Sequence, residues 1–161
     1  MRVALLIFFI LLSLLSPAQA ELVKQIKSII KDSSNNFQSF KGSFLNLQEK
    51  DSVFASLITI EGTSKNDILV SNEMVIYRAI VVDSVNEKRG KKIVDQWQQT
   101  ISGILSGKFK HEKIKVVDWN PGKYGWNFIN GNVSIGITLY SLNPEATLYW
   151  VCFGITRFKP E

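Results

Sequence analysis

The side chains that could perform acid–base chemistry gather in one short stretch of the chain. His111 is the single histidine, Glu112 follows it directly, and Asp118 precedes Trp119 and the turn-forming residues Asn120-Pro121-Gly122. A carboxylate paired with a second carboxylate or with a histidine can hydrolyse glycosidic or acyl bonds. The structural interpretation of the same residues is a histidine in a surface loop and an aspartate that caps the turn. A small secreted hydrolase using Asp118 with Glu112 or His111 is therefore kept as the alternative hypothesis.

A second candidate is the aromatic cluster around the same turn, formed by Trp119, Tyr124 and Trp126. Exposed rings beside a turn can stack on sugars, peptides or partner side chains, because they bury a large area at a low cost in side-chain entropy. Rings in a strand also fill the core or shield one face of a sheet, and this interpretation stands beside the first. If a surface of the chain binds a partner, the predicted contact consists of these three residues and an exposed face of the sheet.

Other chemistries lack the residues that they need. One cysteine excludes an intramolecular disulfide, a cysteine-rich zinc site and a CxxC redox pair, and one histidine excludes histidine-cluster metal sites. The sequence contains no GxGxxG or GxxxxGK[ST] phosphate loop and no DxDxDG calcium loop. Cys152 lies in an aromatic and apolar run that is typical of a sheet interior, so we interpret it as a core thiol. We expect no cofactor, no metal and no catalytic residue.

The first twenty residues have the pattern of a secretory signal peptide. Met1-Arg2 begins with a positive charge, residues 3–15 form an apolar run broken only by a serine, and Ala18-Gln19-Ala20 places small residues at the two positions that a signal peptidase reads. The apolar run is shorter than the ~20 residues that a membrane-spanning helix needs. We predict cleavage after Ala20, so that residues 1–20 are removed and the mature chain begins at Glu21.

The predicted mature chain, residues 21–161, has the length and composition of one domain. Cleavage removes Arg2 and lowers the net charge from +5 to +4. The densest basic segment, Lys88-Arg89-Gly90-Lys91-Lys92, is interpreted as a solvated helix face, with a docking patch for an anionic surface as its alternative. We expect no nucleic-acid binding, because lysines and acidic residues are mixed along the chain. We also expect a mature form that is not embedded in a membrane.

Two segments have the periodicity of amphipathic helices. Apolar residues recur at spacings of three and four over residues 22–30, before a run of turn-forming residues. A longer stripe predicts a helix over residues 86–106, with Ser84 or Asn86 as its N-cap and Gly107 just after its end. The second helix is the most strongly indicated element of the chain.

Most of the remaining chain is predicted to form strands. In one run Tyr77 and Arg78 lie on opposite faces, and Asn130-Gly131 predicts a tight hairpin between two others. Residues 37–44 are interpreted as a linker or a short strand, and residues 63–67 as a polar loop. β-branched and apolar runs predict strands over residues 53–60, 74–82, 114–119, 124–129, 133–141 and 147–158.

Two of these runs alternate strictly, which indicates half-buried antiparallel strands with one core face. The face predicted to join the core consists of Val133, Ile135, Ile137 and Leu139 in one run and Tyr149, Val151, Phe153 and Ile155 in the other. The opposite face consists of Ser134, Gly136, Thr138 and Tyr140, with Trp150, Cys152, Gly154 and Thr156.

The order of elements predicts the α+β class, because strands come in runs and do not alternate with helices. We expect two helices packed on a mainly antiparallel sheet of about five to six strands, in the order α-β-β-α-β-β-β-β. The leading functional hypothesis is a small exported protein, secreted or periplasmic, that binds an unidentified protein or glycan without enzymatic activity. A structural or inhibitory partner of another exported protein is a third hypothesis.

Overall fold

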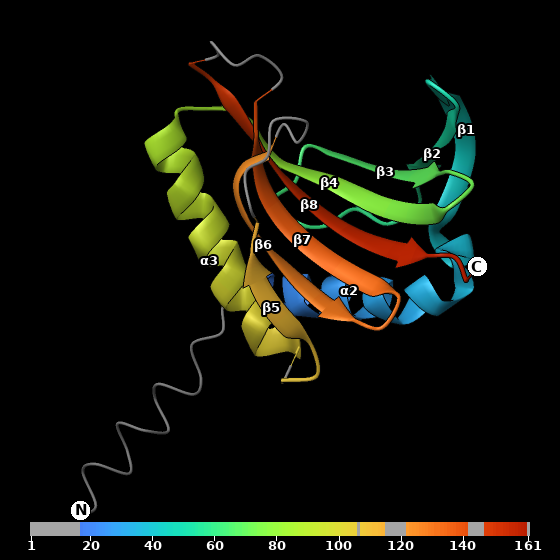
Figure 1. The fold of residues 1–161 in the computed structure, drawn as a ribbon, viewed down its shortest axis with the longest axis horizontal. Helices are drawn as coiled ribbons and strands as arrows, with labels where there is room; N and C mark the ends of the chain where they lie inside the picture. Colours follow the sequence, from blue (N-terminus) through green and yellow to red (C-terminus); the bar gives the residue numbers. More distant parts are fainter. Residues whose placement is uncertain (1–16, 106, 115–121, 142–146, 161) are drawn as a thin grey trace, which may run out of the picture.

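The chain folds as two similar successions of a helix followed by four strands (Figure 1). The structure is a computed structural model that describes residues 17–105, 107–114, 122–141 and 147–160. The first succession consists of α2 (Pro17–Asp32), the 3-10 segments η1 (Ser33–Asn35) and η2 (Gln38–Phe40), β1 (Lys41–Gln48), β2 (Asp51–Ser56), β3 (Lys65–Val70) and β4 (Met74–Val85). The second consists of α3 (Glu87–Leu105), β5 (Lys110–Lys113), β6 (Gly122–Asn130), β7 (Val133–Tyr140) and β8 (Tyr149–Phe158).

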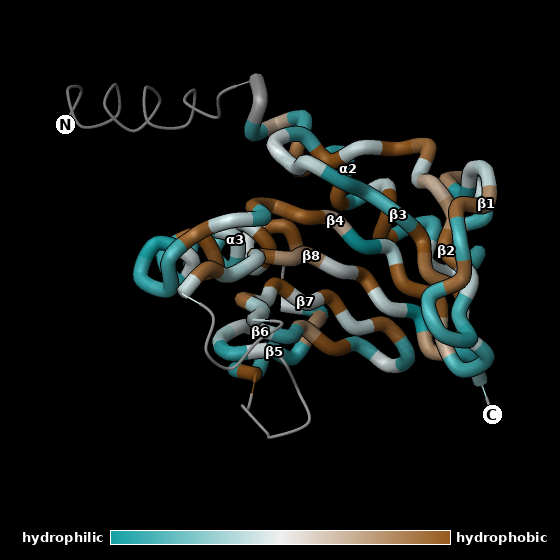
Figure 2. The backbone as a smooth tube through the Cα atoms, turned by 90° about the horizontal axis from the view of Figure 1, so that it is seen from above, coloured by the Kyte–Doolittle hydropathy of each residue, from teal (hydrophilic) through white to brown (hydrophobic). Residues whose placement is uncertain are grey.

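The strands form one antiparallel sheet in the order β1-β2-β3-β4-β8-β7-β6-β5. The last strands of the two successions, β4 and β8, pair with each other, so the two halves share one continuous sheet. Figure 2 shows α2 and α3 on the same side of this sheet. The other side carries no helix among the described residues, and we call it the open face. The predicted α+β class with an antiparallel sheet is confirmed.

A narrow apolar stripe holds α2 to the sheet. Ile26 and Ile29 have no exposed surface, whereas Lys27 and Ser28 between them are exposed. After the helix, Phe37 adopts a left-handed backbone conformation (φ 57°) and is fully buried, with its ring centroid 6.4 Å from that of Tyr77. The left-handed conformation costs about 1–2 kcal/mol for a residue with a Cβ, which the burial of a phenyl ring offsets.

The second helix, α3, begins and ends as its sequence predicts. The Asn86 side chain accepts a hydrogen bond from the backbone N–H of Arg89 (3.0 Å), which is the expected N-cap contact. Gly107 follows the helix with a φ of 75°, a conformation that favours glycine. Val94 and Ile101 are fully buried and join the same core as α2.

The core lies between the helices and the sheet, on the face that the alternation predicts. Ile135, Ile137 and Leu139 of β7 and Val151, Phe153 and Ile155 of β8 are each at most 1% exposed. Tyr77 of β4 lies in this core, and its neighbour Arg78 lies on the open face, as predicted. The hairpin between β6 and β7 also forms, with Gly131–Asn132 as its two-residue turn, one residue later than the sequence suggests.

The described residues contain eight strands, so the predicted count of five to six is wrong. The segment interpreted as a linker or short strand continues into β1, the polar segment that includes Asp67 belongs to β3, and the polar segment that includes His111 is β5. The observed order is therefore α-β-β-β-β-α-β-β-β-β. The sequence left β1 open as a linker or a short strand and did not predict β3 and β5 as separate strands, because their polar or exposed residues are stabilised by neighbouring strands and not by a local apolar pattern.

The region of the predicted cleavage site lies at the start of α2. Ala18 and Ala20 are helical, and Ala20 is exposed, as its neighbour Gln19 is. Among the residues whose burial the structure describes, the first in the helix to pack against the core is the partly buried Leu22. No helix formed by the described residues is long and apolar enough to cross a membrane. The signal peptide itself stays a prediction.

Candidate functional site

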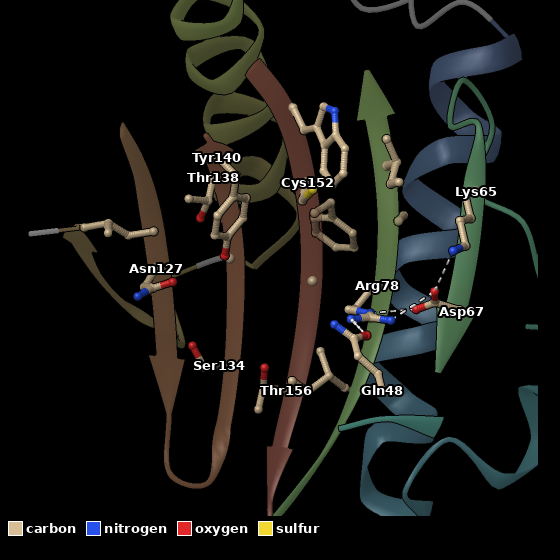
Figure 3. A pocket seen from close by; sticks show the side chains of 18 residues that line it. Gln48, Lys65, Asp67, Arg78, Asn127, Ser134, Thr138, Tyr140, Cys152 and Thr156 are labelled. Carbon is tan, nitrogen blue, oxygen red and sulfur yellow. Dashed lines mark hydrogen bonds and ion pairs between the residues drawn. The ribbon is translucent and has the colours of Figure 1, made fainter. Parts of the chain in front are cut away.

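The open face of the sheet is hollowed into a trough of about 640 Å³ (Figure 3). This volume lies within the ~300–1,000 Å³ that is typical of sites for small molecules. The trough crosses the junction between the two halves of the sheet, because its walls come from β1, β3 and β4 on one side and from β6, β7 and β8 on the other. Its central residues are Gln48, Lys65, Asp67, Ile76, Arg78, Ile80, Asn127, Ser134, Gly136, Thr138, Tyr140, Trp150, Cys152, Gly154 and Thr156.

The floor of the trough follows β7 and β8, whose open-face residues pair across the two strands. Gly136 lies opposite Gly154 in the middle of this floor, and the Asn127 amide oxygen lies 3.0 Å from the position that a Cβ would take at Gly136. From one end to the other, the cross-strand pairs are Tyr140 with Trp150, Thr138 with Cys152, Gly136 with Gly154, and Ser134 with Thr156. The floor thus changes from aromatic to glycine to hydroxyl along the strands.

One wall of the trough carries an ion pair in which the carboxylate is buried and the guanidinium is partly exposed. The Arg78 guanidinium donates from Nε to Asp67 Oδ1 (2.7 Å) and from Nη2 to Asp67 Oδ2 (3.1 Å). The guanidinium also donates from Nη1 to Oε1 of Gln48 (3.1 Å), and Gln48 is the last residue of β1. Strands lie ~4.8 Å apart, so β1 and β4 would be ~14 Å apart in a flat sheet. The contact between Gln48 and Arg78 shows that β1 curls toward the open face and closes one side of the trough.

Asp67 needs this pairing because its side chain is only 5% exposed. A buried carboxylate without a partner is strongly destabilising, whereas two aligned hydrogen bonds from a guanidinium compensate the loss of hydration. Lys65 lies 3.7 Å from the same carboxylate, with its own side chain mostly exposed. Among the described residues that line the trough, the charged groups are Lys65, Asp67 and Arg78, so the trough carries a net charge of +1.

The ionisable side chains of the floor are uncharged at neutral pH. Burial raises the pKa of the Cys152 thiol to about 11, and the nearby Arg78 opposes this only in part. Burial likewise raises the pKa of Tyr140. A thiol with a raised pKa is a poor nucleophile, because the thiolate is the reactive form. Cys152 lines the trough and does not face the helices, so the interpretation as a thiol of the main core needs this correction.

Two of the three aromatic residues predicted to bind a partner, Tyr124 and Trp126, lie on the helix side of the sheet. The Tyr124 hydroxyl donates a hydrogen bond to Asp95 of α3 (2.7 Å), which is the main cause of the raised pKa of Tyr124. The Lys113 ammonium lies 4.7 Å from the centroid of the Tyr124 ring. Trp126 is partly buried against the core, and Trp119 lies outside the described residues. Binding by these three residues stays a prediction.

The alternative hydrolase residues are only partly placed. His111 and Glu112 are consecutive residues of β5, so their side chains point to opposite faces of the sheet. The His111 ring lies 6.1 Å from the rings of Trp126 and Phe128 on the helix side, whereas Glu112 pairs with Asn127 of the open-face row. Asp118 lies outside the described residues. No group of three or more potential metal ligands occurs within the described ranges.

Sequence reasoning placed eight trough residues on one face of two strands but did not identify them as a site. Its two signals were a lone arginine in an apolar strand and a succession of small and polar residues on one face of β7 and of β8. Neither signal shows that Arg78 and Gly154 are neighbours, because that depends on the pairing of β4 with β8. Comparisons with known proteins add no relative: no protein-family model, no curated protein and no solved structure matches the chain.

Proposed function

We propose that this protein is an exported, non-enzymatic binding domain that holds its ligand in the trough of the open face. The observation that carries the proposal is the shape of the floor. Two glycines face each other there: Gly154 leaves room that a larger side chain would fill, and the Asn127 amide oxygen lies beside Gly136. Charged and hydroxyl side chains surround this part of the floor. Ligand sites are typically concave and largely preformed, with a few polar groups that fix the orientation of the ligand.

The trough is a better candidate than the aromatic cluster around residues 119–126. Tyr124 and Trp126 are engaged by α3, by lysine side chains and by the core, so much of their surface is already covered. The trough side chains Arg78 and Trp150 keep 33% and 39% of their surface exposed. Available surface with mixed chemistry is what an incoming ligand requires.

Export is proposed from the N-terminal pattern, and the structure supplies a supporting argument. Among the residues whose burial the structure describes, those of α2 that pack on the core (Leu22, Ile26, Ile29 and Ile30) all follow the predicted cleavage point after Ala20. The test is to isolate the protein from its native source and determine its N-terminal residue and its compartment. Recovery from the secreted or periplasmic fraction with Glu21 at the N-terminus is expected, and a retained Met1 or cytoplasmic recovery would contradict export.

Binding in the trough can be tested by filling it. A Cβ at Gly154 would lie 3.5 Å from the Tyr77 carbonyl oxygen and 3.8 Å from Ile76 Cγ2, which are ordinary contacts, so Gly154→Leu is expected to fold with its side chain in the trough. Gly103→Leu is the matched control, because a Cβ at this exposed position of α3 meets nothing within 4 Å.

The mature protein and both variants are immobilised and exposed to the exported fraction of the native source, and the retained molecules are identified by mass spectrometry. The expected result is a species that the native protein and Gly103→Leu retain equally and that Gly154→Leu retains roughly tenfold less, a difference of ~1.4 kcal/mol. Equal retention by all three proteins would show that the trough is not the binding site.

A further inference from the structure

We propose that the ligand of the trough is an amphipathic carboxylate, with its anionic group at Arg78 and Lys65 and its apolar part along the floor toward Trp150. This inference rests on the proposed function and names its ligand class. The trough combines three features that such a molecule requires: a single excess positive charge among its described residues, hydrogen-bond donors that no described residue uses, and an apolar surface beside them.

The charge and the free donors define the anionic end of the ligand. A guanidinium has five N–H donors, and Arg78 uses three of them for Asp67 and Gln48. One N–H on each terminal nitrogen has no acceptor among the described residues. These two N–H groups can donate hydrogen bonds to the oxygens of a carboxylate. The adjacent Lys65 ammonium, whose side chain is 61% exposed, can turn toward the same group.

The net charge distinguishes a carboxylate from a more highly charged anion. Lys65 and Arg78 together carry +2, and Asp67 cancels one of these charges inside the trough. A carboxylate with a charge of −1 balances the remainder. A phosphate monoester, with a charge of ~−1.5 to −2, would remain partly uncompensated beside the buried Asp67 carboxylate.

The apolar end of the ligand follows from the residues on either side of the charge. On β4, Ile76 and Ile80 flank Arg78 on the open face, because they lie two residues before and after it. On the floor, the Tyr140–Trp150 pair lies four residues along the strands from the Gly136–Gly154 pair, a separation of ~13 Å at ~3.3 Å per residue. An apolar body can therefore extend along the glycine floor to the aromatic pair while its carboxylate stays at Arg78.

The test compares two probes that differ in charge but hardly in shape. Isothermal titration calorimetry measures the affinity of the mature protein for 4-phenylbutyrate and for its neutral amide. The expected result is roughly tenfold tighter binding of the acid. Raising the salt concentration from ~0.05 to ~0.5 M should remove most of this difference, because it screens the partly exposed charges. Equal affinity for the two probes, or no detectable binding of either, would overturn the carboxylate assignment.

Two variants locate the charge effect at the proposed residues. Lys65→Gln changes an exposed side chain and should reduce the preference for the acid by ~2–3-fold. The double variant Asp67→Asn with Arg78→Gln removes both charges of the pair and retains hydrogen-bonding side chains. Because Lys65 remains, its preference for the acid should fall to the ~2–3-fold that this lysine provides. A preference for the acid that is unchanged in both variants would place the anionic group elsewhere and contradict the proposal.

A second pair of probes distinguishes a free acid from the carboxyl terminus of a peptide. N-acetyl-alanyl-phenylalanine and its C-terminal amide present the same contrast in charge on a peptide. Tighter binding of the peptide acid than of 4-phenylbutyrate assigns the carboxylate to a chain terminus, and the reverse order assigns a free acid; both results support the ligand class. Failure of the carboxylate assignment can be told apart from failure of the proposed function. The capture experiment, in which the native protein retains a ligand and Gly154→Leu loses it, does not use these probes.

Discussion

At the scale of single residues, the pair Asp67–Arg78 shows how a buried charge can occupy the middle of a sheet. The two residues lie directly opposite each other on β3 and β4, so a side chain from each strand reaches the other without leaving the open face. Burial of a carboxylate at this position is tolerated because a guanidinium supplies two aligned donors. The stability of the protein should therefore depend far more on Arg78 as the partner of Asp67 than on the exposed Lys65.

We therefore expect single substitutions in the pair to lower the free energy of unfolding more than a double substitution that replaces both residues. Arg78→Met leaves the Asp67 carboxylate without its guanidinium and should lower the free energy of unfolding by ~3–5 kcal/mol, whereas Lys65→Met should change it by less than ~1 kcal/mol. Asp67→Leu combined with Arg78→Met replaces the pair by apolar groups and should recover most of the loss. Urea denaturation of the native protein and the three variants checks the prediction, and a double variant no more stable than Arg78→Met would contradict it.

The thiol of Cys152 provides a pH-dependent prediction at the same scale. Because burial raises its pKa from 9.0 to about 11, the folded protein has less thiolate at pH 8 than an ordinary cysteine, and its alkylation by iodoacetamide should be slow. The unfolded state loses this proton near pH 9, before the folded state does, so the thiol lowers stability as the pH rises from 9 toward 11.

The measurement is the alkylation rate of the folded protein between pH 7 and 11, with the urea-unfolded protein as control. The unfolded protein should react at the rate of a free cysteine at every pH, and the folded protein should approach that rate only near pH 11. A folded protein that reacts as fast as the unfolded one at pH 8 would show that the thiol is neither buried nor shifted.

At the scale of elements, two glycines of α3 have opposite roles. A Cβ at Gly90 would lie 2.4 Å from Leu139 Cδ1 and 3.3 Å from Val85 Cγ1, and Leu139 is fully buried, so Gly90 permits the close approach of α3 to β7. Gly103 lies on the exposed face of the helix, with open space around its Cβ position. A glycine in an exposed helix position destabilises the helix without any compensating contact.

We therefore expect alanine substitutions of opposite sign. Gly103→Ala should raise the free energy of unfolding by ~0.5–1 kcal/mol through helix propensity. Gly90→Ala should lower it by ~1–3 kcal/mol, because the added methyl group forces a buried leucine away from α3. Thermal unfolding followed by circular dichroism compares the two variants with the native protein. Stabilisation by Gly90→Ala would show that the packing between α3 and β7 is looser than the structure indicates.

The elements that could be predicted from the sequence are those with a local signal. The apolar stripe and the N-cap of α3 predict a helix, and the alternation in β7 and β8 predicts half-buried strands. The predicted core face of β7 and of β8 is confirmed. β3 was missed because Asp67 resembles a loop residue until Arg78 of the next strand is placed beside it. β5 was missed because its four polar residues form a strand only by pairing with β6.

The trough was beyond prediction for the same physical reason. Its polar faces on β7 and β8 were identified, and so was the outward direction of Arg78, but these pieces form a site only when β4 pairs with β8 and β1 curls toward the open face. That pairing joins residues almost eighty positions apart, as Arg78 with Gly154. The local pattern of a strand contains no information about such a partner.

At the scale of the whole molecule, the junction between β4 and β8 makes the two halves interdependent. β4 pairs with β8 along nearly its whole length, and the trough lies over this junction. The same core contains Ile29 of the first half together with Ile137 and Phe153 of the second. Separation of the halves would expose two strand edges and divide the core, which disfavours a state with one half folded and the other unfolded.

Cooperative unfolding of the whole chain is therefore the expected behaviour. Ile29→Ala in α2 and Ile137→Ala in β7 each leave a cavity at a fully buried position and should each cost ~2–5 kcal/mol. Both variants should shift a single urea transition to lower concentration without changing its slope, and tryptophan fluorescence and far-ultraviolet circular dichroism should report coincident curves. Because Trp97 packs on Phe153 in the second half, fluorescence largely follows that half. A fluorescence curve unmoved by Ile29→Ala, while the circular dichroism curve shifts, would show that the halves unfold separately and that the β4–β8 junction does not couple them.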